Sequence, residues 1–153
     1  MANAVTSGTN WTIVGGYGHS LKGKNNLAFA DVAYDFTANV GVVVGYDVLW
    51  TKGANQFNSV KGGVTLQTDI YPLKWTGVNL LSGIKGTPFV GALLATPKGG
   101  GNVGTILTTG INFDVVDFSK FSFDLGFQYE NRSGQGQWDG SYGLVHLGLS
   151  RRF

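Results

Sequence analysis

Hydrophobic and polar residues alternate with a period of two along most of the chain, and a helical period never persists beyond about one turn. Successive side chains of a β-strand point to opposite faces, so each face of such a strand must meet a different environment. The clearest run covers residues 121–130, where one face carries Phe121, Phe123, Leu125, Phe127 and Tyr129. The pattern predicts an all-β fold.

Eight segments carry this alternation. They are residues 11–18, 26–36, 40–50, 60–70, 87–96, 105–116, 121–130 and 141–153. Polar, Gly-rich stretches at 19–25, 51–56, 97–103 and 132–140 alternate with tight turns near 37–39 and 117–120. Long loops at one end and short turns at the other are typical of an up-and-down barrel in an outer membrane. The exception is the longer link 72–86, where Trp75 and the apolar run 78–81 could lie at an interface or form a small helix.

Composition fits a surface that is only partly exposed to water. Charged residues make up 13% of the chain, about half the ~25% of soluble domains, whereas 25 residues are Gly and 13% are aromatic. At 153 residues the chain forms one domain, 1–153, in which residues 1–9 are expected to be a flexible N-terminal segment. The predicted fold is a single eight-stranded antiparallel up-and-down transmembrane β-barrel.

Several protein classes are excluded or disfavoured. The net charge of +2 and the scattered Lys and Arg residues do not predict a nucleic-acid partner. No apolar run approaches the ~18 residues of a membrane helix. Cys is absent, so disulfides and thiolate metal sites are excluded. The first ten residues lack the basic start and apolar stretch of a signal peptide, so an exported chain would need a leader removed earlier or another route of delivery.

Alternation alone fits two barrels: a membrane barrel with its apolar face outward, and a soluble lipocalin-like barrel that binds an apolar ligand inside. The polar face is rich in Gly, and the crowded interior of an eight-stranded barrel accepts small residues. Aromatic residues near the predicted strand ends suggest girdles at the two membrane interfaces, although aromatic residues are also common in strands generally. The predicted interface residues are Trp11, Tyr46, Trp50, Phe121, Tyr129 and Phe153.

Charge is sorted between the predicted lumen and the loops. The carboxylates assigned to inner faces are Asp31, Asp35, Asp47, Asp69, Asp114, Asp124 and Glu130, whereas the cations in or beside loops are Lys22, Lys24, Lys52, Lys98 and Arg132. The predicted polar network of the lumen comprises Asp31, Asp47, Lys61, Gln67, Asp69, Asp124, Gln128, Glu130, His146 and Arg152. Unpaired charges in a narrow interior are costly, so we expect ion pairs centred on Arg152, bound water or protonated carboxylates.

The C-terminal segment YGLVHLGLSRRF, residues 142–153, resembles the closing strand of bacterial outer-membrane barrels, which ends in an aromatic residue. Residues 87–94, TPFVGALL, and the preceding DIYPL at 69–73 are similar to strands of the small opacity and OmpA-like barrel families. The resemblance implies an outer-membrane location, contact with the lipid bilayer, and recognition of the C-terminal strand by the barrel-assembly machinery. The loop cations suit the phosphates of lipopolysaccharide, or simply keep the loops soluble.

Chemical motifs are weak. Residues 99–104 fit GxGxxG by letter, but a strand-like run follows where a dinucleotide site needs a helix, so a hairpin loop is predicted. His146 and Ser150 share a strand face, yet four residues along a strand span roughly 13 Å, too far for a hydrogen bond. His19 and His146 show no metal-ligand spacing. The aspartates could bind a cation, although a solvated polar plug is favoured. No cofactor, metal or catalytic residue is predicted.

The sequence therefore predicts an outer-membrane barrel with a polar, plugged lumen, which acts as a structural or interaction protein through its extracellular loops rather than as an enzyme. Eight strands leave no wide aqueous channel. Three alternatives stay open: a narrow cation-preferring pore, since the predicted lumen is acidic; a soluble lipocalin-like barrel; and a lipid-modifying barrel enzyme.

Overall fold

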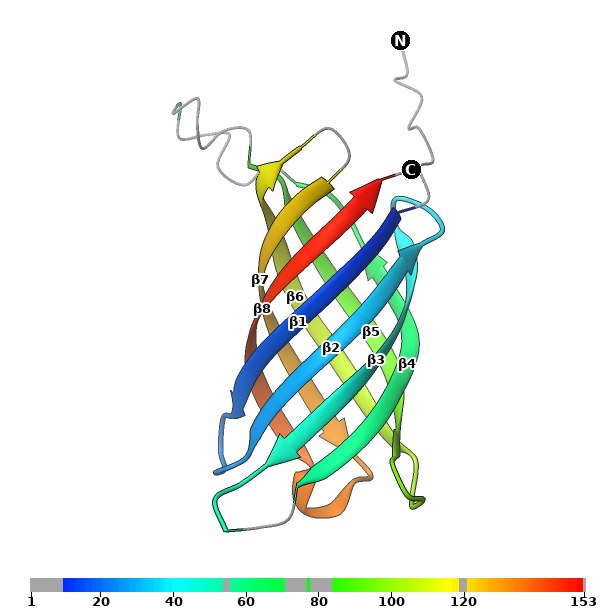
Figure 1. Cartoon of the computed structure of the whole chain (residues 1–153), viewed down its shortest axis with the longest axis vertical. Coiled ribbons are helices and arrows are strands. Elements are labelled where there is room, and N and C mark those ends of the chain that lie inside the picture. Colours follow the sequence, from blue (N-terminus) through cyan, green and yellow to red (C-terminus); the bar gives the residue numbers. More distant parts are fainter. Residues whose placement is uncertain (1–9, 54–55, 71–76, 78–83, 119–120, 153) are drawn as a thin grey trace.

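The computed structural model describes residues 10–53, 56–70, 77, 84–118 and 121–152, except for the side chains of Asn10, Asp117 and Arg152. The described chain forms one closed antiparallel barrel in which each strand pairs with its neighbours in sequence and the last strand pairs with the first (Figure 1). The strands are β1 (Asn10–Ser20), β2 (Asn26–Asp35), β3 (Val40–Trp50), β4 (Phe57–Gln67), β5 (Gly86–Pro97), β6 (Gly104–Asp117), β7 (Phe121–Ser133) and β8 (Gly140–Arg152). The predicted fold class, an eight-stranded up-and-down barrel, is confirmed.

Closure follows a regular register. β1 pairs with β8 from Asn10 opposite Arg152 to Ser20 opposite Tyr142, so the barrel has no free strand edge. A closed barrel satisfies its backbone hydrogen bonds within the wall, which is what a strand needs in order to cross lipid. The described part of the chain contains no helix that could serve as a membrane span.

The largest differences from the predicted strand boundaries, three residues each, are at both ends of β4 and at the end of β7. β4 begins at Phe57 rather than Val60 and ends at Gln67, because Asn58 and Ser59 already pair with β3. Beyond β4, Ile70 makes only an isolated bridge with Gly86. β7 continues through Arg132 to Ser133, where the prediction had a loop, because these residues still pair with β6. Sequence-based prediction missed the start of β4 and the end of β7 because the residues there are polar and resemble loop residues.

The connections distinguish the two ends of the barrel. The loop end carries residues 21–25, 51–56, 98–103 and 134–139, and the last of these contains a short 3₁₀ helix, η2 (Gly136–Trp138). The terminal end carries the start of β1, the end of β8, and the connections 36–39, 68–85 and 118–120. The longest connection therefore lies at the terminal end, in agreement with the sequence analysis, which sets the link 72–86 apart as the exception to short turns at that end. The predictions for residues 1–9, Trp75 and 78–81 fall outside the described residues.

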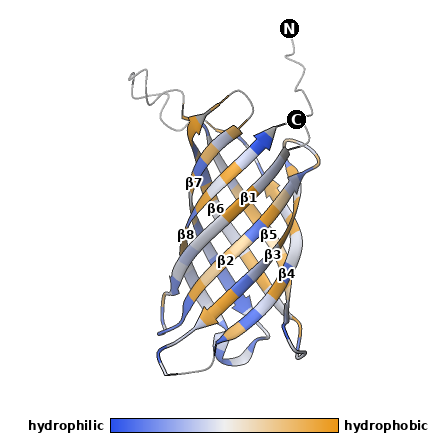
Figure 2. Cartoon of the chain, in the orientation of Figure 1, coloured by the Kyte–Doolittle hydropathy of each residue, from blue (hydrophilic) through white to orange (hydrophobic). Residues whose placement is uncertain are grey.

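The strands point apolar side chains outward. Figure 2 shows hydrophobic and hydrophilic residues alternating along the ribbons. Large apolar residues are exposed on every strand, among them Ile13 (61%), Val32, Val44, Val64, Leu94, Leu107, Phe127 and Leu147 (68%). Among the strand residues whose side chains are described, Arg151 at the end of β8 is the one outward Asp, Glu, Lys or Arg.

The inner face holds two apolar clusters and most of the charge. The larger cluster lies toward the loop end and contains Leu27, Phe29, Leu49, Trp138, Tyr142 and Leu144. The smaller one contains Leu93, Ala95 and Ile106. Buried polar residues extend along the inner face from Gln135 in the β7–β8 connection to Ser122 and Asp124 near the terminal end. The interior of this barrel is therefore filled by side chains, as expected for eight strands.

Candidate functional site

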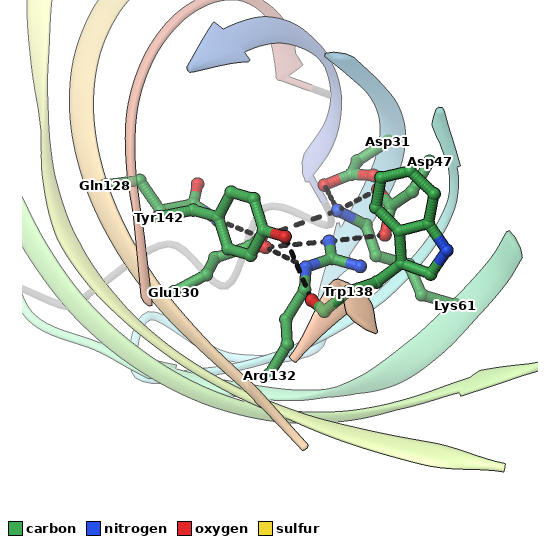
Figure 3. Close-up of polar contacts among 8 residues, drawn as sticks. All are labelled: Asp31, Asp47, Lys61, Gln128, Glu130, Arg132, Trp138 and Tyr142. Carbon is green, nitrogen blue, oxygen red and sulfur yellow. Dashed lines mark hydrogen bonds and ion pairs between the residues drawn. The ribbon is translucent and has the colours of Figure 1, made fainter. Parts of the chain in front are cut away.

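An ion-pair network crosses the lumen (Figure 3). The Nζ atom of Lys61 lies 2.9 Å from Asp47, 3.1 Å from Asp31 and 3.8 Å from Glu130. Arg132 Nη2 lies 2.6 Å from Asp47 and donates to Glu130 at 2.8 Å. Asp47 and Glu130 therefore each contact both cations. This cluster of Asp31, Asp47, Lys61, Glu130 and Arg132 is called the lumen network below.

Neighbouring strands bring these side chains together. Asp31 lies on β2, Asp47 on β3 and Lys61 on β4, and in the barrel register Gly45 pairs with both Asp31 and Lys61. A Cβ atom at Gly45 would collide with the Asp31 carboxylate. Glycine at this position therefore leaves the space in which Asp31 reaches Lys61 across β3.

The network is almost fully enclosed. The side chains of Lys61, Asp47, Glu130 and Arg132 are each at most 1% exposed. Transferring such charges out of water is costly, and only mutual pairing with additional hydrogen bonds offsets that cost. Gln128 donates to Glu130 at 2.7 Å, and Lys61 also lies 4.5 Å from the centre of the Phe29 ring. The lumen network therefore connects β2, β3 and β4 to β7 across the interior of the barrel.

A folded loop covers the network at the loop end. Trp138 of η2 is 4% exposed, and its ring stacks on Phe57 of β4 at 5.7 Å between centroids. The Tyr142 hydroxyl donates to the Trp138 carbonyl at 2.9 Å, and Asn25 of the β1–β2 loop donates to the Gln137 carbonyl. Figure 3 shows the Trp138 and Tyr142 rings beside the network. We call Trp138, Phe57 and Tyr142 the aromatic plug.

Glycine residues allow the backbone of the β7–β8 connection to fold into the lumen. Gly134, Gly136 and Gly140 have φ values of 86°, 67° and 138°, which L side chains rarely adopt. The Asp139 carboxylate accepts the backbone N–H groups of Gly134 and Gln135 at 3.2 and 2.6 Å. These features fold the β7–β8 connection back on itself and direct Trp138 into the lumen.

A second polar cluster lies at the terminal end. Lys85 lies 3.1 Å from Asp114 and 3.6 Å from Asp69. Ser150 donates to Asp124 at 2.6 Å. The described side chains of this cluster are less enclosed than the lumen network: Lys85 is 23% exposed and Asp69 is 50% exposed.

A cavity of about 90 Å³ lies between the lumen network and the terminal end. It is large enough to hold water, for which about 10–15 Å³ suffices. Its polar lining includes Thr12, Asp31, Asp35, Lys61, Thr65, Gln67, Thr108, Asn112, Gln128, Glu130 and His146. Val14, Val43, Phe89 and Leu93 supply apolar wall.

The predicted lumen residues occupy different places. Asp31, Asp47, Lys61, Gln128 and Glu130 meet in or beside the lumen network. Gln67 and His146 line the cavity, whereas Asp124 and Asp69 belong to the terminal end. The side chain of Arg152 is outside the described set, so the predicted Arg152-centred network stays a prediction.

The assignment of Arg132 to a loop was wrong. Arg132 is 1% exposed and shares the inner face of β7 with Glu130 and Gln128, because the alternation of that strand continues past its predicted end. Had the alternation of inward and outward residues in β7 been extended past residue 130, it would have placed the side chain of Arg132 in the lumen. Lys85 was not assigned at all, since it lies in the link 72–86 that carried no clear pattern.

Aromatic side chains lie on the outer wall near both ends. Trp11, Trp50 and Phe121 are outward and close to strand ends. Tyr46 and Tyr129 are also outward, but each lies four residues from the end of its strand, β3 or β7. Phe153 is not described. The structure adds further outward rings that the sequence did not single out: Tyr17, Tyr34, Phe36, Phe118 and Phe123. Trp11 packs against Tyr34 at 4.7 Å, and Tyr17 against Trp50 at 5.9 Å.

The remaining motifs acquire structural roles. Gly99, Gly100 and Gly101 adopt positive φ in the β5–β6 hairpin, and strand β6 follows the GxGxxG letters. His146 Nε2 lies 2.5 Å from Asn112, while Ser150 is bonded to Asp124 and Thr12. His146 and Ser150 thus point into the lumen toward different partners.

Together these features define a closed eight-stranded barrel with an apolar exterior and a charged, side-chain-filled lumen. No family model and no curated protein matches the chain. Among solved structures it is similar to the N-terminal β-barrel domain of Pseudomonas aeruginosa OprF, with 12% identity, a TM-score of 0.55, and 96% of this chain and 98% of that chain covered. It is also similar to a de novo designed transmembrane β-barrel, with 14% identity, a TM-score of 0.53, and 96% of each chain covered. The Yersinia pestis outer membrane protein Ail in a phospholipid bilayer nanodisc has 14% identity and a TM-score of 0.50, with 95% of this chain and 99% of that chain covered. At these identities the likeness establishes the fold.

Proposed function

We propose that this chain is an outer-membrane β-barrel that spans the bilayer with its apolar wall, holds a polar plug in its lumen, and acts as a structural or interaction protein through its loops. The observation that carries the proposal is the exposed outer wall. Residues within the strands, such as Ile13, Val44, Leu107 and Leu147, are 59–68% exposed. Soluble proteins rarely expose so large a contiguous apolar surface, which in a membrane contacts lipid tails.

The distribution of charge opposes the soluble alternative. A water-soluble barrel that binds an apolar ligand needs an apolar interior and a charged exterior. Here Lys61, Asp47, Glu130 and Arg132 are buried inside, and the outer wall carries the apolar residues. The outward aromatic residues near both strand ends fit the girdles of a membrane-spanning barrel.

The lumen favours a plugged barrel over the narrow cation-preferring pore. The lumen network crosses the interior, and the aromatic plug closes it at the loop end. A lipid-modifying enzyme is also disfavoured, because Ser150 and His146 face the enclosed lumen and contact different partners. The arrangement supports mechanical stability of the wall instead of chemistry or conduction.

The loop end offers a basic surface for interaction. Lys22, Lys24, Lys52 and Lys98 are all exposed there. The exposed Asp139 uses its carboxylate within its own loop. Such a surface suits anionic groups such as the phosphates of lipopolysaccharide. The C-terminal strand β8 closes the barrel by pairing with β1, and its resemblance to the closing strands of outer-membrane barrels supports recognition by the barrel-assembly machinery.

Detergent dependence tests the proposed function. The purified chain is expected to require detergent or lipid for a folded, monodisperse state, because its outer wall is apolar. On gels, the unheated sample should migrate differently from the boiled one, since a closed barrel resists unfolding by detergent. A monodisperse folded monomer in plain buffer would contradict the proposal.

A further inference from the structure

We propose that the lumen is a vestibule that admits small cations from the terminal end only, and that the aromatic plug and the lumen network seal it toward the loop end. The inference rests on the proposed membrane-spanning function and adds to it a sidedness and a class of ligand. The structure carries it through three features: the plug, the position of the cavity, and the charge of the cavity wall.

The seal at the loop end has two layers. Trp138 lies at 4% exposure over Phe57 and Tyr142, and the fully buried Leu27 and Leu49 pack with them. The lumen network lies next along the barrel, where Lys61 and Arg132 join the carboxylates of β2, β3 and β7. An ion entering from the loops would have to displace both layers.

The cavity lies on the other side of this seal. Its lining runs from Lys61 and Glu130 of the network to Asp35 and Gln67, the last residues of β2 and β4. Those strand ends form the rim of the terminal end. Asp35 and Gln67 are partly exposed, in contrast to Lys61 and Glu130. The cavity therefore extends toward the terminal end and stops at the network.

The cavity wall favours cations. Its described lining includes the carboxylates Asp31, Asp35 and Glu130 and a single Lys or Arg, Lys61, which is already shared among three carboxylates. Two further lining residues, Thr108 and His146, are 7% and 3% exposed and each has a polar atom with no hydrogen-bond partner among the described residues. The lining thus carries three carboxylates against one ammonium group, so its net charge is negative, and a narrow cleft of net negative charge attracts cations.

The chain contains no Cys, so the reaction of a single introduced cysteine with a thiol reagent reports directly whether the reagent reaches that position. Thr65→Cys places a thiol on the cavity wall. Ser59→Cys places one on the same face of the same strand, at 0% exposure between the network and the plug. Both changes are close to isosteric. In lipid vesicles, membrane-impermeant cationic and anionic methanethiosulfonates of similar size are added to one side and then to both.

Two surface cysteines report orientation and insertion. Ala38→Cys lies in the exposed β2–β3 turn at the terminal end, and Gln137→Cys is exposed at the loop end. In any one spanning molecule, reagent on one side reaches only one of the two cysteines, so the fractions of Ala38→Cys and Gln137→Cys labelled from that side sum to one. Complete labelling of both from one side would contradict the proposed membrane insertion itself, and is thus distinguishable from a failure of the vestibule.

The vestibule predicts that Thr65→Cys reacts only from the side that labels Ala38→Cys. Relative to a free thiol, the cationic reagent should be favoured about 10-fold or more. Ser59→Cys should stay unreactive from both sides, and adding Trp138→Ala should make it react from the loop end at least 10-fold faster. Labelling of Thr65→Cys from the loop end, a preference for the anionic reagent, or no effect of Trp138→Ala would each overturn the proposal. The Thr65 and Ser59 pair tests sidedness even if Trp138→Ala does not fold.

Discussion

Replacing Lys61 with methionine is expected to lower the free energy of unfolding by about 3–5 kcal/mol, because removal of one partner leaves buried charges without compensation. Lys61 is the cation that contacts Asp31, Asp47 and Glu130 together. Methionine keeps much of the stem's volume and removes only the charge and its donors. Urea titration of the chain folded into lipid vesicles measures the change.

A matched control separates this effect from the general loss of a lysine. Lys98→Met removes an exposed cation in the β5–β6 loop and is expected to change stability by less than about 0.5 kcal/mol. Combining Lys61→Met with Asp31→Asn should recover part of the loss, since it removes one of the stranded carboxylates. Equal midpoints for Lys61→Met and the parent would show that the network does not brace the barrel.

Replacing Leu147 with arginine is expected to destabilise the barrel in a bilayer by about 2–4 kcal/mol, the cost of a cation on the lipid face near the midplane. Leu147 is 68% exposed and pairs with Leu125 on β7 and Gly15 on β1, in the middle of the wall. No large packing defect accompanies the change, so the penalty comes from the surroundings. Urea titration in vesicles again gives the value.

The control for this change lies at the rim of the same wall. Ser133→Arg places the same side chain at the exposed end of β7 and is expected to cost about 0–1 kcal/mol, as for positions near the interface. On a soluble barrel both arginines would meet water and both would be nearly neutral. Equal stability of the two variants in lipid would therefore contradict the membrane assignment.

The fold could be predicted from sequence because alternation is a local property. The runs at 121–130 and 40–50 show the period of two directly; the first lies within β7 and the second coincides with β3. The ends of the strands were harder to predict than the strands themselves, as the start of β4 and the end of β7 show. Polar residues at the rim of a barrel resemble loop residues. The bulge between Asp114 and Val116, which exposes both Val115 and Val116, also breaks the pattern that sequence analysis relies on.

The sequence predicted most of the residues of the lumen network but not which of them contact one another. Alternation places Asp31, Asp47, Lys61 and Glu130 on inner faces, yet which of them touch depends on the register around the barrel. Arg132 illustrates the limit: its inward direction follows from the phase of β7, but its contact with Asp47 joins residues 85 apart in sequence. The inward fold of Trp138 depends on loop conformation, for which the pattern of the sequence carries no signal.

The most direct test of an apolar wall facing lipid compares two tryptophans on opposite sides of it. Trp11 is 47% exposed on the outer wall, whereas Trp138 is 4% exposed in the lumen. Two variants, each keeping one of them and replacing the other three tryptophans with phenylalanine, are folded into vesicles containing lipids brominated on the acyl chains. Strong quenching of Trp11 fluorescence and little quenching of Trp138 is the predicted result. Quenching of Trp138 with Trp11 unaffected, or quenching of neither, would contradict the account.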